Sequence, residues 1–276
     1  MPSYLVTGAA RGLGYGFLKV LAADPNNVVL GLVRNTSAAK ALLAADGIPD
    51  ANVHLLQADI TDVNGLKVAA AEASEILGDA GLDVLINNAA YINQTAVLRT
   101  LADDEDNIQL AADELHKSFD TNVVGVLKTV IAFLPLIRKS QLKKVVTISS
   151  AMGDLDFINQ THIGYDAPYA ISKAAVNALV AKLAATYEGE GILFISLCPG
   201  MVMTTAAENA AKYEDPDLLT RMQDIYSKMS AYSSSLQPPS APEDAARKVL
   251  DAIERSSLES GSSGSFLSHN GTKKFL

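Results

Sequence analysis

The fold of this chain is decided by the stretch Tyr4-Leu5-Val6-Thr7-Gly8-Ala9-Ala10-Arg11-Gly12-Leu13-Gly14 near its N-terminus. An apolar strand ends at Thr7 and runs straight into a glycine-rich turn, after which apolar residues recur with helical spacing. Strand, glycine-rich turn and helix in this order form the start of a dinucleotide-binding unit. There the glycines let the backbone approach a pyrophosphate at the positive end of the helix. A tight strand-to-helix turn without a ligand is the alternative.

The rest of the chain alternates between apolar strands and helices. Each later strand is a short run rich in Val, Ile and Leu, and these runs cover residues 28–33, 53–57, 82–86, 144–148, 193–197 and 265–267. Continuous apolar strands separated by helices are typical of a parallel sheet with both faces covered. We therefore predict one α/β domain over residues 1–276, a Rossmann-type doubly wound parallel sheet.

Composition narrows the possible partners of this 276-residue chain. Its net charge of −9 argues against nucleic acid and anionic membranes as partners. Its four histidines show no ligand spacing, so no metal site is expected. The single cysteine, Cys198, excludes an internal disulfide and suits a reducing compartment. No apolar run approaches the roughly 18 residues that span a bilayer, and the early first strand leaves no room for a signal peptide, so we expect a cytoplasmic protein.

The end of the second strand bears on the choice between NAD and NADP. In NAD-binding folds an acidic residue about 20 positions beyond the glycines binds the ribose 2′-hydroxyl. Here that position holds Val33 or Arg34, and no Asp or Glu occurs between Asp24 and Asp46. Arg34 and Arg11 could instead bind a 2′-phosphate, which an acid would repel. The pattern favours NADP(H), with two solvated arginines as the alternative.

Polar residues follow further strands at their carboxyl ends, the edge at which ligands bind in such sheets. Asp59 follows the third strand, and Asp62 just beyond it is expected to cap the next helix. The fourth strand ends in Asn87-Asn88-Ala89-Ala90, whose amides could bond backbone or cofactor, and a simple Asx turn is the alternative. The fifth strand delivers Ser149-Ser150, and the sixth ends in Pro199-Gly200-Met201-Val202-Met203-Thr204.

Tyr169 and Lys173 lie four residues apart at the start of a helical pattern. That spacing places the phenol and the ammonium on one face of a helix. A cation one turn away favours the phenolate, so Lys173 is expected to lower the pKa of the Tyr169 phenol from its usual value of about 10. Such a phenol could exchange a proton near neutral pH, as carbonyl reduction requires. Alone, such a pair is more often a core contact beside a solvated charge.

Two further segments bear on assembly and on substrate binding. A long helix is predicted from about Asp113 to Ile137, and its apolar face is wider than one sheet contact needs, which favours a subunit interface. The segment at about 205–240 has a broken helical pattern after a strand end, which is typical of a substrate lid. Its methionines and tyrosines favour an apolar or aromatic substrate, although ordinary packing explains them equally well.

Taken together, these motifs resemble the classical short-chain dehydrogenase/reductase family over nearly the whole chain. In family order they are Thr7-Gly8-Ala9-Ala10-Arg11-Gly12-Leu13-Gly14, Asn87-Asn88-Ala89-Ala90, Asn122, Ser150, Tyr169-x-x-x-Lys173 and Pro199-Gly200-x-x-x-Thr204. Within the family the chain looks nearest to the small carbonyl and keto reductases, which include C-factor-like and fungal ketoreductases.

The resemblance implies a role for each of four catalytic residues. Tyr169 would be the general acid in reduction, and Lys173 would lower its pKa and bind the nicotinamide ribose. Ser150 would hold the carbonyl oxygen, and Asn122 would keep a water that links Lys173 to solvent. Ser150 is preferred to the serine before it because Ser-x-x-Gly spacing fits the family pattern. Tyr165 is a competing phenol, but it has no lysine four residues on.

The resemblance also implies the cofactor NADP(H) and a set of residues around it. These are Gly8, Arg11, Gly12, Leu13, Gly14, Arg34, Asp59, Ile60, Asn87, Ala89, Tyr169, Lys173, Val202 and Thr204. The chain departs from the family at Ala90, where glycine is usual, and a positive φ there would cost roughly 1 kcal/mol. The separation between serine and tyrosine is also longer than usual, and residues 156–164 are expected to form a loop over the substrate.

The leading interpretation is an NADPH-dependent oxidoreductase that reduces a small ketone or aldehyde to an alcohol. A non-catalytic NADP-sensing or scaffold protein would keep the fold without the chemistry, yet Tyr169 and Lys173 are both present. An NAD-dependent alcohol dehydrogenase is a third possibility, and Val33 and Arg34 argue against it. Members of the family often form homodimers or homotetramers, which the wide apolar helix face would suit.

Overall fold

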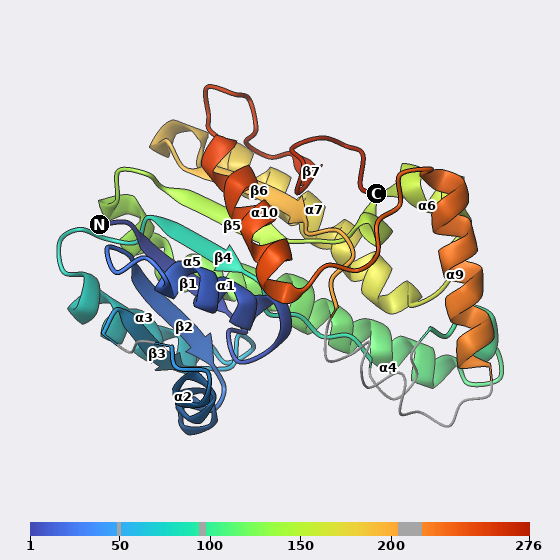
Figure 1. The fold of residues 1–276 in the computed structure, drawn as a ribbon, viewed down its shortest axis with the longest axis horizontal. Helices are drawn as coiled ribbons and strands as arrows, with labels where there is room; N and C mark the ends of the chain where they lie inside the picture. The colour runs from blue at the N-terminus through green and yellow to red at the C-terminus, as the bar shows by residue number, and fades with distance from the viewer. Residues whose placement is uncertain (49–50, 94–97, 204–216) are drawn as a thin grey trace.

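One parallel sheet forms the centre of the fold, and α4 (Ile108–Phe119), α6 (Leu155–Thr161) and α9 (Leu218–Tyr232) extend beyond it (Figure 1). The computed structural model describes residues 1–48, 51–93, 98–203 and 217–276, and within these ranges seven strands pair in the order β3-β2-β1-β4-β5-β6-β7. The strands are β1 (Ser3–Thr7), β2 (Val28–Val33), β3 (Val53–Gln57), β4 (Val84–Asn87), β5 (Lys144–Ile148), β6 (Leu193–Cys198) and β7 (Phe266–Ser268). All six pairings are parallel, which confirms the predicted Rossmann-type sheet.

Helices cover both faces of this sheet, as the unbroken apolar strands predict. The helices on one face are α1 (Gly12–Ala22), α2 (Thr36–Ala45) and α10 (Pro242–Arg255), and those on the other are α3 (Val63–Leu77), α5 (Gly125–Lys139) and α7 (Ala167–Thr186). Successive strand residues point to opposite faces, so Leu5 packs with the second set of helices and Val6 with the first. Both side chains are fully buried, so each strand contributes to two cores.

The strand order reverses between β1 and β4, and this reversal determines where a ligand can bind. β1 pairs with β2 on one side and with β4 on the other, so the chain crosses the sheet after β3. In an open parallel sheet the connections on the two sides diverge there and leave a crevice at the carboxyl ends of the strands. The glycine-rich turn after β1 lies at this point.

A single long helical segment carries Asn122, but it is less regular than the sequence predicts. It comprises α4 (Ile108–Phe119), a π-helical turn η2 (Asp120–Val124) and α5, and so begins before the expected Asp113. By length and composition alone this segment could cross a membrane, but over half of its most apolar window (56%) is buried inside the protein, as in a core helix. Phe119, Leu127 and Ile131 are exposed, and the subunit interface expected on this segment stays a prediction.

Residues 156–164 do not form the loop that we expected. Most of them belong to a short helix, α6 (Leu155–Thr161). Asp154 caps it by accepting a hydrogen bond from the Phe157 N–H at 2.9 Å, and His162 ends it in the left-handed conformation. The expected loop is therefore wrong, because an aspartate at the N-cap and a left-handed residue at the end favour a helix between them.

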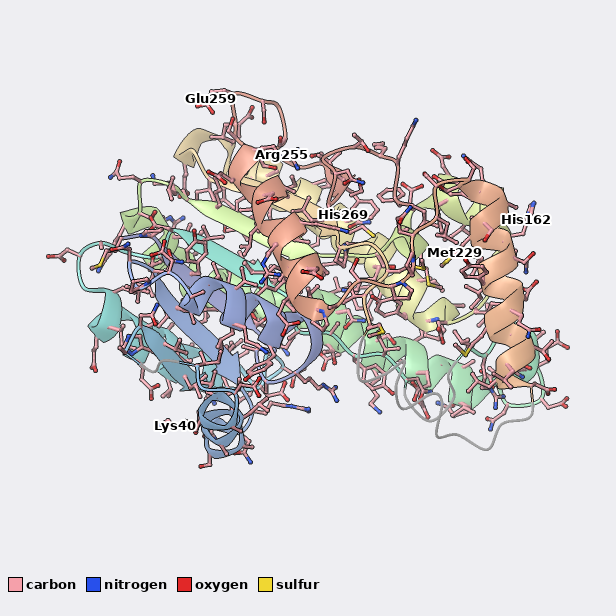
Figure 2. All side chains as sticks on the ribbon, viewed as in Figure 1. Lys40, His162, Met229, Arg255, Glu259 and His269 are labelled. Atoms are coloured by element: carbon pink, nitrogen blue, oxygen red, sulfur yellow. The ribbon has the colours of Figure 1, made fainter. Side chains whose placement is uncertain are left out.

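Beyond the carboxyl edge of the sheet, α6 packs against α9 (Leu218–Tyr232), and α4 extends beneath them (Figure 1). The Phe157 and Tyr232 rings meet edge to face, with their centroids 5.0 Å apart. Figure 2 shows Met229 on the side of α9 that faces the body of the protein. The predicted lid at about 205–240 thus includes α9, while its first part, 205–216, lies outside the described residues.

Candidate active site

The turn after β1 is shaped by close backbone contacts that only glycine permits. A Cβ on Gly8 would lie 2.9 Å from the Ala89 Cα, and Gly8 has a φ of +68°. A Cβ on Gly14 would lie 2.3 Å from the Gly8 carbonyl oxygen and 2.5 Å from the Asn88 amide nitrogen. Since real Cβ atoms do not approach other atoms so closely, the turn between β1 and α1 must keep these glycines. The sequence motif is therefore explained by packing as well as by a ligand.

The N-terminus of α1 fits a pyrophosphate. Its N-cap residue, Arg11, makes no side-chain capping bond, and no acidic residue lies in the first turn. At Gly12 a Cβ would meet nothing within 4 Å, so the backbone there borders open space. The first N–H groups of a helix need acceptors and carry partial positive charge, which an anionic diphosphate would satisfy. Leu13 is buried and packs in the hydrophobic core beneath the turn.

Two exposed arginines border this crevice at the ends of β1 and β2. The side chains of Arg11 and Arg34 make no hydrogen bond or ion pair within the described part of the chain. Arg34 lies near enough to Asp59, just after β3, to help lower its pKa. Burial raises the pKa of Asp59, but hydrogen bonds from Thr61 and the two cations Arg34 and Lys128 outweigh it and leave the pKa below its usual value. Neighbouring Ile60 is buried, so these residues could form one wall of an adenosine site.

The first turns of α7 bring Tyr169 and Lys173 together. The Lys173 ammonium lies 5.5 Å from the centroid of the Tyr169 ring and donates to the Ile148 carbonyl oxygen at 2.8 Å. Only 3% of Lys173 is exposed, and burial lowers its pKa to about 8. Such a lysine loses part of its charge just above neutral pH.

The expected lowering of the Tyr169 pKa by Lys173 is not what the structure shows. Burial raises the pKa of the Tyr169 phenol, and the nearby Cys198 thiol and Asp166 carboxyl raise it further, while a hydrogen bond with Ser150 acts in the opposite direction. Removal of water disfavours the phenolate, and Lys173 does not offset this effect on the phenol. The phenol is therefore held in its protonated form in the protein without ligand.

Ser150 stands at the carboxyl end of β5, beside Tyr169. Its hydroxyl accepts from the Met152 N–H at 3.3 Å and lies close enough to the phenol to lower its pKa. Ser149 points elsewhere, since only 2% of it is exposed and its hydroxyl has no partner in the described chain. A Cβ on Gly153 would lie 2.7 Å from the backbone of α7, so the Ser-x-x-Gly turn can pack closely beside Lys173. This close contact explains why glycine follows Ser150 at the third position.

Asn122 lies in the π-helical turn and connects two segments of the site by hydrogen bonds. It is fully buried, its side-chain oxygen accepts from the Tyr91 N–H at 2.7 Å, and its amide donates to the Tyr91 carbonyl at 2.9 Å and to the Ser172 hydroxyl at 2.8 Å. The Ser172 hydroxyl in turn donates to the Tyr169 carbonyl at 2.7 Å. Asn122 thus ties the segment after β4 to the helix that carries Tyr169 and Lys173. The water that it was expected to keep stays a prediction.

The segments after β4 and β6 complete the described site. Asn87 is buried in the sheet and Ala89 lies against Gly8, whereas Asn88 reaches the glycine-rich turn by donating its amide to the Thr7 carbonyl at 3.0 Å. Ala90 does not have a positive φ, so its replacement of glycine brings no strain of that kind. The backbone of Val202 pairs with that of Ser240 in an isolated parallel β-bridge. Thr204, which was expected to contact the cofactor, lies outside the described residues.

Sequence reasoning placed Cys198 in the core but missed its position at the site. It is the last residue of β6, 4% exposed, and close enough to Tyr169 and Lys173 to affect the pKa of both. Burial raises the pKa of its thiol, opposed by backbone N–H groups of Gly200 and Ala151. Its place directly before Pro199 at a strand end was the available signal.

This geometry can hold a carbonyl oxygen and give it a proton. The Ser150 hydroxyl and the protonated Tyr169 phenol are two donors side by side at the carboxyl edge of the sheet, close to the crevice that fits a dinucleotide. Among the described residues no cluster of His, Cys, Asp and Glu could hold a metal ion. Tyr169 and Ser150 offer proton transfer and oriented hydrogen bonds.

Comparison with known proteins agrees with this arrangement. The family model for short chain dehydrogenase matches residues 3–215. The chain belongs to this family. Short-chain dehydrogenase/reductase AacuF of Aspergillus aculeatus is 43% identical over 277 aligned residues, and short chain dehydrogenase virK of Hypocrea virens is 37% identical over 276, each alignment covering both chains completely. The NADPH-bound carbonyl reductase from chicken fatty liver has the same fold, with a TM-score of 0.76 and 26% identity over 99% of this chain and 98% of its own.

Membership in the short-chain dehydrogenase family makes the protein an oxidoreductase whose fold binds a nicotinamide cofactor. The open backbone at Gly12 and the uncapped first turn of α1 fit the diphosphate of such a cofactor. The cofactor contacts expected from the sequence stay a prediction, and Asn88 joins the glycine-rich turn through its bond to the Thr7 carbonyl.

Proposed function

We propose that this short-chain dehydrogenase uses NADPH to reduce a ketone or aldehyde to an alcohol. The observation that carries the proposal is the pairing of a protonated Tyr169 phenol with Ser150 at the carboxyl end of β5, directly beside buried Lys173. A raised pKa suits an acid that must hold its proton until the substrate oxygen becomes basic. The structural likeness to the chicken liver protein, an NADPH-bound carbonyl reductase, supports the same class of reaction.

The chain's own residues would divide the work as follows. The bound nicotinamide supplies hydride to the carbonyl carbon. Ser150 holds the carbonyl oxygen by a hydrogen bond, and Tyr169 donates its proton to that oxygen as negative charge develops on it. Lys173, with a pKa of about 8, then favours the phenolate that remains and fixes the ribose of the cofactor. Asn122 keeps the helix of Tyr169 in place through Ser172.

The exposed Arg11 and Arg34 support the choice of NADPH over NADH. Both are exposed at the edge of the crevice, and the chain between Asp24 and Asp46 has no acid that would bind a 2′-hydroxyl. An arginine fork binds a 2′-phosphate strongly because each contact is charge-assisted. We further propose a cytoplasmic protein with one catalytic domain over 1–276, which works as a homodimer or homotetramer.

Replacing the phenol tests the catalytic assignment. Tyr169→Phe should lower kcat for carbonyl reduction at least about 100-fold, because the acid is lost while packing is kept. Tyr165→Phe is the matched control, since it removes a phenol on the same segment that hydrogen-bonds to Asp224 instead, at 3.0 Å, and it should stay within a few-fold of wild type. A fully active Tyr169→Phe would mean that Tyr169 is not the general acid of this reaction.

A fluorescence titration with NADPH and NADH tests the cofactor assignment. The wild-type protein should bind NADPH at least tenfold more tightly than NADH, and Arg34→Asp should reverse or abolish this preference by repelling the 2′-phosphate. Lys40→Asp, a charge change of the same size on exposed α2, is the control and should leave the preference unchanged. Equal or tighter binding of NADH by the wild type would instead favour an NAD-dependent alcohol dehydrogenase.

A further inference from the structure

Two residues without a glycine's freedom adopt the left-handed conformation next to the candidate site. Asp166, which precedes the first turn of α7, has φ 51° and ψ 42°, and Leu98, in the segment after β4, has φ 57°. Side chains with a Cβ avoid this region, and a bulky leucine avoids it strongly. Residues held there against their preference cluster at functional sites.

Asp166 and the Leu98–Arg99 segment hold each other in place. The Leu98 N–H donates to the Asp166 carboxylate at 3.1 Å, and the Asp166 N–H donates to the Arg99 carbonyl at 2.8 Å. An aspartate at the N-cap of a helix usually accepts from the helix's own first N–H groups, but Asp166 makes no such capping bond. Its carboxylate instead accepts a hydrogen bond from a residue that lies 68 positions earlier in the sequence.

The carboxyl of Asp166 has few partners among the described residues. Burial raises its pKa to about 6, opposed by the Leu98 N–H. The charged groups of the surrounding elements have other partners: Arg99 pairs with Asp104, Arg221 with Asp103, and Asp224 with Lys228 and Tyr165. Buried Lys173 donates to a carbonyl. Among the described residues no cation is therefore paired with this carboxylate, which lies at the start of α7, three residues before Tyr169, and is one of the groups that disfavour ionisation of that phenol.

We propose that Asp166 is a positioning residue whose carboxylate acts through its charge on the catalytic end of α7 and whose hydrogen bonds fix segment 98–99 against the first turn of that helix. The inference rests on the proposed role of Tyr169. The carboxylate favours the protonated Tyr169 phenol, which is the form that reduction needs. The hydrogen bonds to Leu98 and Arg99, which we call the tether, set the distance between α7 and the segment after β4. The protein accepts a strained and poorly solvated aspartate there because of its effect on the neighbouring phenol.

Two substitutions separate the charge from the tether. Asp166→Asn keeps an oxygen that can accept from Leu98 and a residue type that tolerates the left-handed conformation, but it removes the charge. Asp166→Gly removes both the charge and the side-chain bond while relieving the strain. Cofactor binding, followed by NADPH fluorescence, should stay unchanged in both variants because Asp166 does not line the dinucleotide crevice.

The expected readout is the pH dependence of the reaction in both directions. In Asp166→Asn the rate of alcohol oxidation, which needs the ionised phenol, should reach half its maximum at a lower pH than in wild type, with kcat at the optimum changed less than about threefold. Asp166→Gly should show the same shift and, in addition, a roughly tenfold fall in kcat/KM, because segment 98–99 loses its tether. Wild-type pH profiles in Asp166→Asn would overturn the inference.

Thermal unfolding gives a second readout that does not depend on catalysis. Because the folded-state pKa of Asp166 is raised above the unfolded value, its charged form costs stability above about pH 6, and this cost is absent below about pH 4. Asp166→Asn should therefore raise the melting temperature at pH 8 and leave it unchanged at pH 4. An equal effect at both pH values would contradict the buried charge. If Tyr169→Phe stays active, the proposed function fails, whereas an inactive Tyr169→Phe beside unshifted Asp166→Asn profiles refutes this inference alone.

Discussion

At the scale of single residues, an uncommon row of polar side chains crosses the core of the sheet. Asn87, Thr147 and Ser196 are direct neighbours on β4, β5 and β6 and share the face that α5 and α7 cover. They are 2%, 1% and 0% exposed, and their side chains have no hydrogen-bond partner among the described residues. A buried hydroxyl without a partner costs stability, since it has lost its bonds to water.

Thr147→Val should therefore raise the free energy of unfolding by about 1 kcal/mol, because it exchanges the unpaired hydroxyl for a methyl group of similar size. Thr129→Val is the matched control: that threonine is 0% exposed, and its hydroxyl donates to the Gly125 carbonyl at 2.8 Å. The control should lose about 1 kcal/mol. Urea unfolding at pH 7 measures both values. A loss in Thr147→Val as large as in the control would mean that its hydroxyl is paired after all.

Helical spacing predicted the contact between Tyr169 and Lys173, but it could not predict their ionisation. The four-residue spacing depends on local geometry, which the sequence specifies. The pKa values depend on how much water the whole fold removes, and this comes from distant segments such as β6, which places Cys198 beside both groups. For the same reason the sequence did not predict the contact between Asp166 and Leu98, since these residues lie far apart in the chain.

At the scale of elements, the π-helical turn between α4 and α5 sets the position of Asn122. A π turn inserts a residue into a helix and often lies at a functional site. Here it carries the asparagine whose amide makes three bonds to Tyr91 and Ser172. Apolar periodicity predicts one continuous helix for this region and gives no signal for the extra residue. The cap of α6 by Asp154, in contrast, was readable from the sequence and was missed.

Asn122→Ala should destabilise the protein by about 2 kcal/mol or more, because it leaves two partly buried backbone groups of Tyr91 and the buried Ser172 hydroxyl without this partner. We also expect kcat to fall by more than about tenfold, since Ser172 bonds to the Tyr169 backbone. Asn27→Ala, at a buried asparagine whose amide donates to the Leu21 carbonyl at 2.9 Å, should cost only about 1 kcal/mol and spare activity. Similar losses in the two variants, measured by urea unfolding and steady-state kinetics, would contradict this connecting role of Asn122.

At the scale of the whole molecule, an aromatic cluster joins the substrate side to the C-terminal segment. Phe275 is 2% exposed, stacks on Phe266 with centroids 4.8 Å apart, and meets Phe157 of α6 edge to face at 6.4 Å. Tyr232 of α9 packs on the same Phe157 ring. The strand and helix pattern could not predict this cluster, because its members come from four segments of the chain and follow no period.

Phe275→Ala should lower the free energy of unfolding by about 3 kcal/mol, as expected for the loss of a fully buried phenylalanine. KM for the carbonyl substrate should rise because α6 and α9 lose a shared contact, while NADPH affinity should stay as in wild type. Phe119→Ala, at a ring that is 43% exposed, is the control and should cost less than about 1 kcal/mol. The idea would be abandoned if both variants unfolded at the same urea concentration.

The contact between α1 and α10 has a consequence for how the protein is made. A Cβ on Gly16 of α1 would lie 2.7 Å from the Pro242 backbone, and Lys19 of α1 forms an ion pair with Glu243 at 2.9 Å. Helix α1, which follows the glycine-rich turn, therefore packs against a helix, α10, that lies more than 200 residues downstream. At typical rates of protein synthesis the nascent chain waits roughly ten to fifty seconds for that partner to leave the ribosome. During this time the apolar side of α1 is uncovered, and a chaperone would have its best opportunity to bind.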